Sequence, residues 1–196
     1  MAEKKSGETR WPVKEHLLDG RPVIIRPLTA DDRDALVHGY HELSSHSVYM
    51  RFLGYKSGLT ETELDHLTHQ HPQEHLSLGI EVNEDGKSRG IGIARYQLVE
   101  GSQPAIAEFG VVVVDRYHGL GGGTLLLRHL CHEARQNSIC CLRGEALATN
   151  LPVIAVLKGF NPRYEPGNDE DTLMVSIPLQ ELDETDGPAP GADPSS

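Results

Sequence analysis

The most restrictive feature of the chain is a run of valines that leads into a cluster of glycines. Val111 to Val114 suit a buried strand, because β-branched side chains pack well on a pleated surface. Glycine then fills four of the five positions from 119 to 123, which allows a sharp turn and leaves the backbone amides uncovered. An apolar run from Leu125 starts a helix, whose N-terminus presents unpaired N–H groups and the positive end of its dipole. Strand, glycine turn and helix together predict an anion site, and phosphate is the usual anion.

Two common phosphate-binding patterns do not fit this loop. A dinucleotide-binding turn requires G-x-G-x-x-G after the first strand, whereas here Thr124 stands at the third glycine position and the loop lies mid-chain. An NTPase loop requires Gly-Lys-Ser/Thr, and no lysine is present. A plain glycine turn that lets helix and strand pack closely stays open as the alternative.

Composition narrows the class of protein. The 196 residues allow one domain plus tails, and no apolar run approaches the ~20 residues of a membrane span. No signal-peptide segment opens the chain. A formal net charge of −11 argues against nucleic acid as a partner, because such proteins need a basic face. Cys131, Cys140 and Cys141 form neither a disulfide framework nor a zinc pattern, so we expect reduced thiols in a cytoplasmic protein.

Hydrophobic periodicity and turn residues predict the order of the elements. Strands are expected over 23–28, 76–82, 90–98, 105–114, 139–148, 160–164 and 172–179, after a segment 11–18 that leads into a hairpin turn. Helices are expected from about residues 30, 45 and 60, and over 121–136 and 150–159. Meandering strands before one long crossover helix predict an α/β fold. Its sheet is mixed, mostly antiparallel, of about six to seven strands flanked by helices.

The ends of the chain differ in composition from its centre. Residues 1–12 are polar and are expected to be flexible. Residues 180–196 are acidic and rich in proline and glycine, without apolar periodicity, and are expected to be disordered. The single domain is therefore expected over residues 13–179.

The valine–glycine stretch resembles a known family motif. From Glu108 to Leu127 it is similar to the acyl-CoA-binding motif of the GCN5-related N-acetyltransferases (GNATs), Gln/Arg-x-x-Gly-x-Gly/Ala between strand and helix. In one register the motif positions fall on His118, Gly121 and Gly123. In a second register they fall on Arg116, Gly119 and Gly121.

Other segments extend the resemblance to about residues 13–179. Asn150 after a strand, followed by Gly159-Phe160, resembles the Asn…Gly-Phe element that closes the same cofactor site. Ile25–Pro27, Ser47–Phe52 and Leu64–Thr68 look like parts of the acetyltransferase domains of bacterial protein-lysine acetyltransferases. Those proteins act on acyl-CoA synthetases, and they often carry a further regulatory or synthetase-like domain.

The resemblance implies a GNAT-like fold, acetyl-CoA as donor and a primary amine as acceptor. The pyrophosphate would lie on the N–H groups of Gly119 to Thr124, and pantetheine amides would pair with an open strand edge at Val111 to Val113. Asn150 would add a side-chain amide. The implied cofactor-binding residues are Val111, Val113, His118, Gly119, Leu120, Gly121, Gly122, Gly123, Thr124 and Asn150.

Glu108 is the candidate catalytic base. An ammonium must lose a proton before it can attack a thioester. Glu108 is a lone acid in an apolar strand, and it lies six residues before Val114, ~20 Å at ~3.3 Å per residue. That reach matches a pantetheine arm, and burial would make the carboxylate a stronger base. In similar lysine acetyltransferases a glutamate at this position is the proposed base. A strand-edge glutamate that faces water stays open as the alternative.

Three further features bear on the chemistry. Many family members have a tyrosine acid four residues before Gly-Phe, where this chain has Ala155. The histidines His66, His69, His71 and His75 lie around a helix-breaking Pro72 and lack cysteine or paired carboxylates, so no metal site is expected. Arg51 could pair with an acid near the cleft, although a surface arginine is the usual interpretation.

The predicted function is transfer of an acetyl group from acetyl-CoA to a primary amine. The acceptor is a protein lysine, for example on an acyl-CoA synthetase, or alternatively a small amine or amino acid. A rival from another class is an acyl-CoA-binding sensor with little turnover. No nucleic-acid or membrane partner is expected, and the sequence leaves monomer and dimer open.

Overall fold

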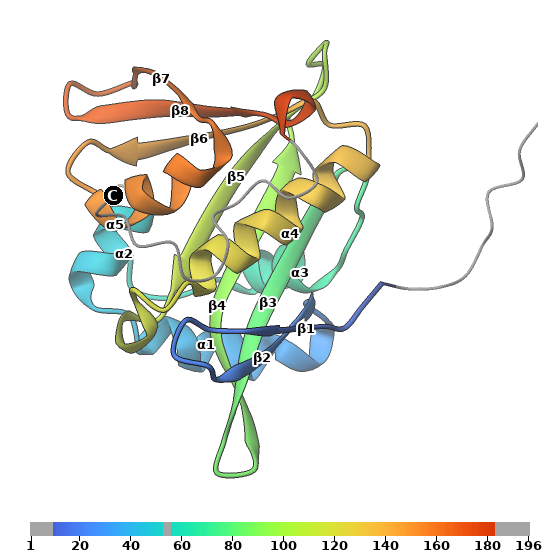
Figure 1. Cartoon of the computed structure of the whole chain (residues 1–196), viewed down its shortest axis with the longest axis vertical. Helices are drawn as coiled ribbons and strands as arrows, with labels where there is room; N and C mark the ends of the chain where they lie inside the picture. The colour runs from blue at the N-terminus through green and yellow to red at the C-terminus, as the bar shows by residue number, and fades with distance from the viewer. Residues whose placement is uncertain (1–9, 53–55, 183–196) are drawn as a thin grey trace, which may run out of the picture.

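The computed structural model describes residues 10–52 and 56–182, and within them eight strands form one sheet in the order β1-β2-β3-β4-β5-β6-β8-β7 (Figure 1). The strands are β1 (Val13–His16), β2 (Pro22–Pro27), β3 (His75–Glu84), β4 (Lys87–Leu98), β5 (Ile106–Val113), β6 (Cys141–Leu147), β7 (Arg163–Pro166) and β8 (Thr172–Pro178). The α-helices are α1 (Arg33–His41), α2 (Ser45–Phe52), α3 (Glu61–Thr68), α4 (Gly122–Gln136) and α5 (Leu151–Leu157). Short 3-10 helices are η1 (Ala30–Asp32), η2 (Asp115–Tyr117), η3 (Lys158–Phe160) and η4 (Leu179–Glu181).

The predicted mixed, mostly antiparallel sheet flanked by helices is confirmed, but the predicted strand count was too low. The additional strand is β1, which pairs with β2 in an antiparallel hairpin. β1 is only four residues long and alternates between half-buried and exposed positions, so its sequence carries little periodic signal.

The pairing between β5 and β6 sets the shape of the sheet. It is the parallel pair of this sheet, and it joins only Ile106, Ala107 and Glu108 of β5 to the start of β6. Beyond Glu108 the two strands diverge, whereas β5 stays paired with β4 as far as Val113. From Phe109 to Val113, the edge of β5 that faces β6 therefore pairs with none of the strands in the described ranges.

Helices cover both faces of the sheet (Figure 1). α4 and α5 lie on the face that carries the main core, where Ala94, Tyr96 and Leu142 pack beneath Leu126 and Leu130 of α4. α1, α2 and α3 lie on the opposite face. Leu28, Leu36, Leu64 and Leu67 form a smaller core there. No helix in the described ranges combines the length and the hydropathy that a membrane crossing requires.

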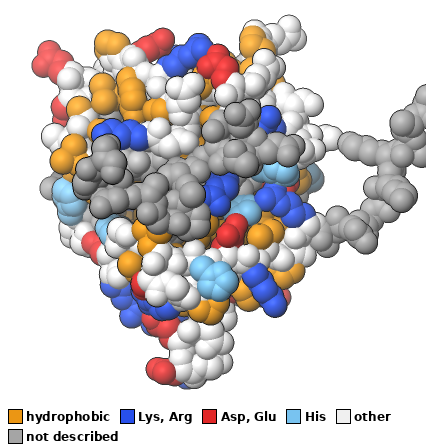
Figure 2. All heavy atoms as spheres, in the orientation of Figure 1, with side chains coloured by type: hydrophobic (Ala, Val, Ile, Leu, Met, Phe, Trp, Pro, Cys, Tyr) orange, Lys and Arg blue, Asp and Glu red, His pale blue; other side chains and the backbone are white. Residues whose placement is uncertain are grey.

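The packed part of the chain extends beyond the bounds that composition suggested. Trp11 packs against the main core, and Leu182 is buried in it. The domain therefore takes in at least residues 11 to 182, while most of the predicted terminal tails, 1–9 and 183–196, lie outside the described residues. On the face that carries α4, acidic and basic side chains lie close to one another (Figure 2).

Candidate active site

The glycine loop has the geometry of an anion site. After β5, the chain makes the short η2 helix and then turns through Gly119 and Gly121, whose φ angles of +73° and +81° favour glycine. Gly121 is the N-cap of α4. The N–H groups of Gly121 to Thr124 precede the first helical bond, from Leu125 N to Gly121 O, and they donate to no described residue. These donors and the positive end of the α4 dipole are available to one anion.

On its other side, the same loop is held by a backbone hydrogen bond and by side-chain packing. Leu18 N donates to the carbonyl of Leu120 at 3.0 Å, which ties the loop to the β1–β2 hairpin. A methyl group on Gly123 would lie 3.5 Å from the side chain of Val156 on α5, and Gly122 is buried beneath Leu17 and Ile80. The glycines thus let α4 pack closely, as the plain-turn alternative held, without using the N–H groups that an anion would need.

Val111 and Val113 lie on the unpaired inner edge of β5. Their side chains pack against the main core on the α4 side, so the free edge offers backbone groups to a ligand. His118 is exposed, and its Nε2 lies 2.7 Å from the carbonyl oxygen of Val113. A carbonyl can only accept, so Nε2 carries the proton and His118 holds the loop against the end of β5.

Asn150 lies beyond the end of β6 that diverges from β5. It is 7% exposed and caps α5, because its Oδ1 accepts a hydrogen bond from Val153 N at 3.3 Å. The side-chain NH₂ group donates to no described residue. The amide oxygen of Asn150 is therefore engaged in the cap, and its amide nitrogen stays available for the predicted cofactor contact.

Glu108 lies where β5 and β6 begin to separate. It stands opposite Gln97 of β4 and Arg143 of β6, on the face away from α4. Its side chain is exposed, so the expected burial of this carboxylate was wrong, and it faces water as the alternative held. It forms no hydrogen bond or ion pair with a residue in the described ranges, so its oxygens are available to an incoming amine.

Arg51 of α2 is a neighbour of this position that the sequence did not assign. A methyl group on Gly110 would lie 2.6 Å from Arg51 Cζ, so the guanidinium rests on the backbone of β5. Burial, together with the like charge of Arg95, lowers the pKa of Arg51 to about 10. The usual interpretation of a surface arginine therefore does not hold. The feature of the sequence that could have indicated this burial is that Arg51 stands among the periodic apolar positions of a short helix.

The histidines from the last turn of α3 to the first residue of β3 lie beside this region. The rings of His66 and His75 stack with centroids 4.3 Å apart, and His75 Nε2 bonds the carbonyl of His69 at 2.5 Å. Burial lowers the pKa of His66, and the nearby charges of His75 and Arg95 add to this shift. In the described part of the chain, no group of three or more metal-binding side chains could hold an ion.

Ala155, which stands where many family members have tyrosine, is exposed on α5. Its methyl group cannot donate a proton. The site therefore brings together an anion-binding loop, an open strand edge and a free carboxylate, without an acid at this position.

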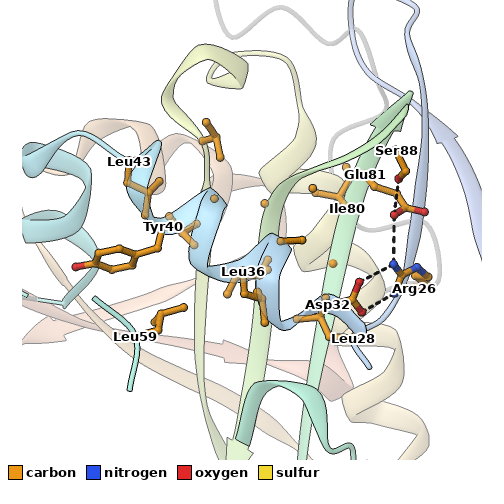
Figure 3. A pocket seen from close by; sticks show the side chains of 18 residues that line it. Arg26, Leu28, Asp32, Leu36, Tyr40, Leu43, Leu59, Ile80, Glu81 and Ser88 are labelled. Atoms are coloured by element: carbon orange, nitrogen blue, oxygen red, sulfur yellow. Dashed lines mark hydrogen bonds and ion pairs between the residues drawn. The ribbon is translucent and has the colours of Figure 1, made fainter. Parts of the chain in front are cut away.

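A cavity of about 250 Å³ lies between α1 and the sheet (Figure 3). Small residues line both walls, namely Ala35 and Gly39 on α1 and Gly79, Gly90 and Gly92 on β3 and β4. Its polar end holds Arg26, which donates to Asp32 at 2.8 Å and to Glu81 at 3.3 Å. None of the residues predicted for the site lines this cavity, although Val112 on its wall lies on β5 two positions after Gly110.

The comparisons with known proteins agree with this geometry. A family model described as an acetyltransferase (GNAT) domain matches residues 23–160. A curated acetyltransferase of Pseudomonas aeruginosa, PA5475, is 37% identical over 163 residues, which cover 82% of this chain and 86% of that protein. The chain belongs to the GNAT acetyltransferase family.

Solved structures match the fold of this GNAT chain closely. The GNAT domain of S. lividans PAT superposes with a TM-score of 0.78 at 24% identity, covering 88% of this chain and 99% of that one. The yncA protein of Salmonella typhimurium, solved with its cofactor acetyl-CoA, gives 0.65 at 19% identity and covers 87% and 99%. The predicted family is thus confirmed, and the predicted fold class with it.

Proposed function

We propose that this chain transfers the acetyl group of acetyl-CoA to a primary amine, with a protein lysine side chain as the first candidate acceptor. The observation that carries the proposal is the unpaired edge of β5 from Phe109 to Val113. It runs from free N–H groups at the start of α4 to the free carboxylate of Glu108. Free Cys131, Cys140 and Cys141 fit the reducing cytoplasm as its location.

The donor fits this edge in one direction. The pyrophosphate lies on Gly119 to Thr124, where its charge meets the α4 dipole. The pantetheine arm follows the free edge of β5 past Val113 and Val111, and its amides take the hydrogen bonds that a further strand would take. The thioester then reaches the point near Glu108 where β5 and β6 converge. From the β6 side, the amide nitrogen of Asn150 donates a hydrogen bond to the bound acetyl-CoA.

The reaction requires a neutral amine. Glu108 accepts a proton from the acceptor ammonium, and the amine nitrogen then attacks the thioester carbonyl carbon. The negative charge moves to the carbonyl oxygen, and a backbone N–H near Val111 stabilises this oxyanion. An exposed carboxylate in the free protein suits this role, because the acceptor itself covers it on binding.

The tetrahedral intermediate collapses by breaking the carbon–sulfur bond. Thiols ionise with pKa values near 8.5, so a thiolate leaves without an acid of great strength. Water can therefore supply the proton that CoA takes up, which is consistent with alanine at position 155. The same substitution favours the rival function, an acyl-CoA-binding sensor with little turnover.

The test measures CoA thiol release from acetyl-CoA against a panel of amines and lysine-containing proteins, an acyl-CoA synthetase among them. Glu108→Gln keeps the shape of the side chain but removes the base, so kcat should fall at least 100-fold, within the usual range for a lost general base. The affinity for acetyl-CoA, measured by calorimetry, should stay within twofold.

Glu100→Gln is the matched control, because Glu100 is exposed in a loop before β5 and lies outside the site. It should leave turnover unchanged. Equal turnover of Glu108→Gln and wild type would show that Glu108 is not the base. Release with free amines alone would identify a small-molecule acetyltransferase, and binding of acetyl-CoA without release for any acceptor would identify the sensor.

A further inference from the structure

The cavity between α1 and the sheet is apolar over most of its wall and polar at one end (Figure 3). Several apolar side chains that border it are only half-buried, namely Leu43, Leu59, Ile93 and Val112. A Cβ atom added to Gly39 would meet no atom within 4 Å, so the open space reaches the helix backbone. An apolar cavity without an occupant forgoes packing contacts, and a ligand that fills it supplies them.

One guanidinium and two carboxylates meet at the polar end of the cavity, so negative charge exceeds positive charge there. Arg26 donates to both oxygens of Asp32 at 2.8 Å, and Asp32 also accepts from Thr29 N. Oε2 of Glu81 accepts from Arg26 at 3.3 Å and from Ser88 Oγ at 2.8 Å. Oε1 of Glu81 accepts no hydrogen bond from a residue in the described ranges. The polar end therefore offers one carboxylate oxygen to a donor from outside.

This carboxylate lies far from the candidate base. Glu81 of β3 stands opposite Gly90 of β4, whereas Glu108 of β5 stands opposite Gln97. The two positions on β4 are separated by ~23 Å, at ~3.3 Å per residue. A small molecule held by Glu81 is therefore not placed to react at Glu108.

We propose that the cavity binds a small organic ammonium ion, whose nitrogen donates to Oε1 of Glu81 and whose apolar body lies against Leu36 and Ile93. The excess of negative charge selects a cation over a carboxylate of the same shape. The cavity of about 250 Å³ holds an ammonium group and an apolar body of about six carbon atoms, since apolar cavities of about 150 Å³ hold benzene. This ligand is distinct from the acceptor amine.

An occupant of the cavity also supports the strand on which acetyl-CoA is proposed to lie. Val112 borders the cavity, and its neighbours Val111 and Val113 lie at the free edge of β5. Val114 borders it too, and leads into η2 and the glycine loop. A ligand that restrains this segment should therefore favour binding of acetyl-CoA, and the reverse. This coupling rests on the proposed function, whereas the ammonium site does not.

Calorimetric titration of the protein without acetyl-CoA tests the site. Three probes share a hexyl chain: N,N-dimethylhexylamine, hexanol and hexanoate. The tertiary amine is protonated at neutral pH, and it forms no stable amide, so it cannot serve as an acceptor. It should bind roughly 10-fold or more tightly than hexanoate, the range for a hydrogen bond to a charged group. Its affinity should fall about fourfold for each methylene removed, as expected for a buried CH₂ group.

Variants identify the place of binding. Glu81→Gln keeps the shape of the side chain and removes its charge, so it should weaken the amine roughly 10-fold and leave hexanol within twofold. Asp85→Asn removes the same charge at the exposed β3–β4 turn and should change none of the affinities. Gly39→Leu fills the cavity and should abolish binding of every probe, whereas Val37→Leu enlarges an exposed side chain of the same helix and should not. Thermal melting verifies that each variant is folded.

Equal binding of amine and hexanoate, or an amine that Glu81→Gln does not weaken, would overturn the ammonium ligand. Binding that survives Gly39→Leu, or the failure of every probe at millimolar concentration, would overturn the site. None of these results bears on the acetyltransferase, because acetyl-CoA is absent.

A second titration measures acetyl-CoA with the amine at saturation. The affinity for acetyl-CoA should rise about fivefold or more in wild type and stay unchanged in Gly39→Leu. An unchanged affinity in wild type would refute the support of β5. If acetyl-CoA does not bind at all, the proposed function fails, and the first titration still decides the ammonium site.

Discussion

Gly39 on α1 and Gly92 on β4 line opposite walls of the cavity, yet a methyl group has opposite consequences at the two positions. A Cβ atom at Gly39 meets no atom within 4 Å, whereas one at Gly92 would lie 2.8 Å from the backbone oxygen of Val112. Gly39→Ala should stabilise the protein by about 0.5–1 kcal/mol, because alanine favours the helix. Gly92→Ala should destabilise it by about 1–3 kcal/mol, because β4 and β5 must move apart.

Urea denaturation measures both changes in the free energy of unfolding. The comparison requires that this free energy falls with urea concentration at the same slope in wild type and in both variants. The two variants control each other, since each adds one methyl group to a glycine that lines the cavity, on opposite walls. A Gly92→Ala protein as stable as wild type would show that the two strands tolerate a wider spacing than their register indicates.

At the residue scale, the sequence patterns indicated which side chains could take part in the reaction better than they predicted the surroundings of those side chains. A lone acid in an apolar strand indicated Glu108, but alternation alone could not say which face of β5 is covered, and the side chain is exposed. The sequence alone favoured a surface position for Arg51, because its contact with Gly110 depends on how α2 packs across the sheet. Such contacts between distant segments leave no periodic signal in one chain.

At the element scale, Asp32 connects the start of α1 to the sheet. Its carboxylate accepts hydrogen bonds from Arg26 at 2.8 Å and from Thr29 N at 2.7 Å. The Arg26 hydrogen bonds, with the Thr29 bonds, hold the pKa of Asp32 below its usual value. A lowered pKa in the folded state means that the ionised group stabilises the protein above its ordinary value of 3.8, and that this contribution is lost as pH falls through the folded value.

Asp32→Asn should therefore lower the free energy of unfolding by about 1–2 kcal/mol at pH 7, since charge-assisted hydrogen bonds are lost. The difference from wild type should shrink as pH falls toward 3. Urea titrations across this range give both values. Asp31→Asn is the matched control, because Asp31 is exposed in the same η1 turn and should have little effect at any pH. A constant difference from pH 7 to pH 3 would mean that ionisation of Asp32 does not matter.

Local patterns placed most elements, because they act within one segment. Thr60 and Glu63 form the capping box that marked the start of α3, and the valine run became β5 as expected. The separation of β5 from β6 could be stated only through the family resemblance. It depends on the residue at which pairing stops. The sequence of one strand does not determine how far it pairs with another strand that is distant in the chain.

At the scale of the whole molecule, the sheet consists of two parts. Strands β1 to β5 form one part and β6, β8 and β7 the other, and three residue pairs at Ile106 to Glu108 join them. A ligand that occupies the free edge of β5 and the start of α4 would contact both the open strand and the crossover helix. We therefore expect acetyl-CoA to act on the stability of the entire fold.

Acetyl-CoA at 100 times its dissociation constant should stabilise the folded protein by about 2.7 kcal/mol, because it binds the folded state only. Hydrogen exchange should slow at those amides between Phe109 and Val113 that point away from β4, and at the amides of Gly121 to Thr124, because both sets lack backbone partners in the described ranges. The amides of β2 and β3 serve as the internal control, since both strands already pair on two sides. ATP or NAD should produce neither effect. A rise in melting temperature without protection of these two segments would place acetyl-CoA elsewhere on the molecule and overturn the assigned cofactor site.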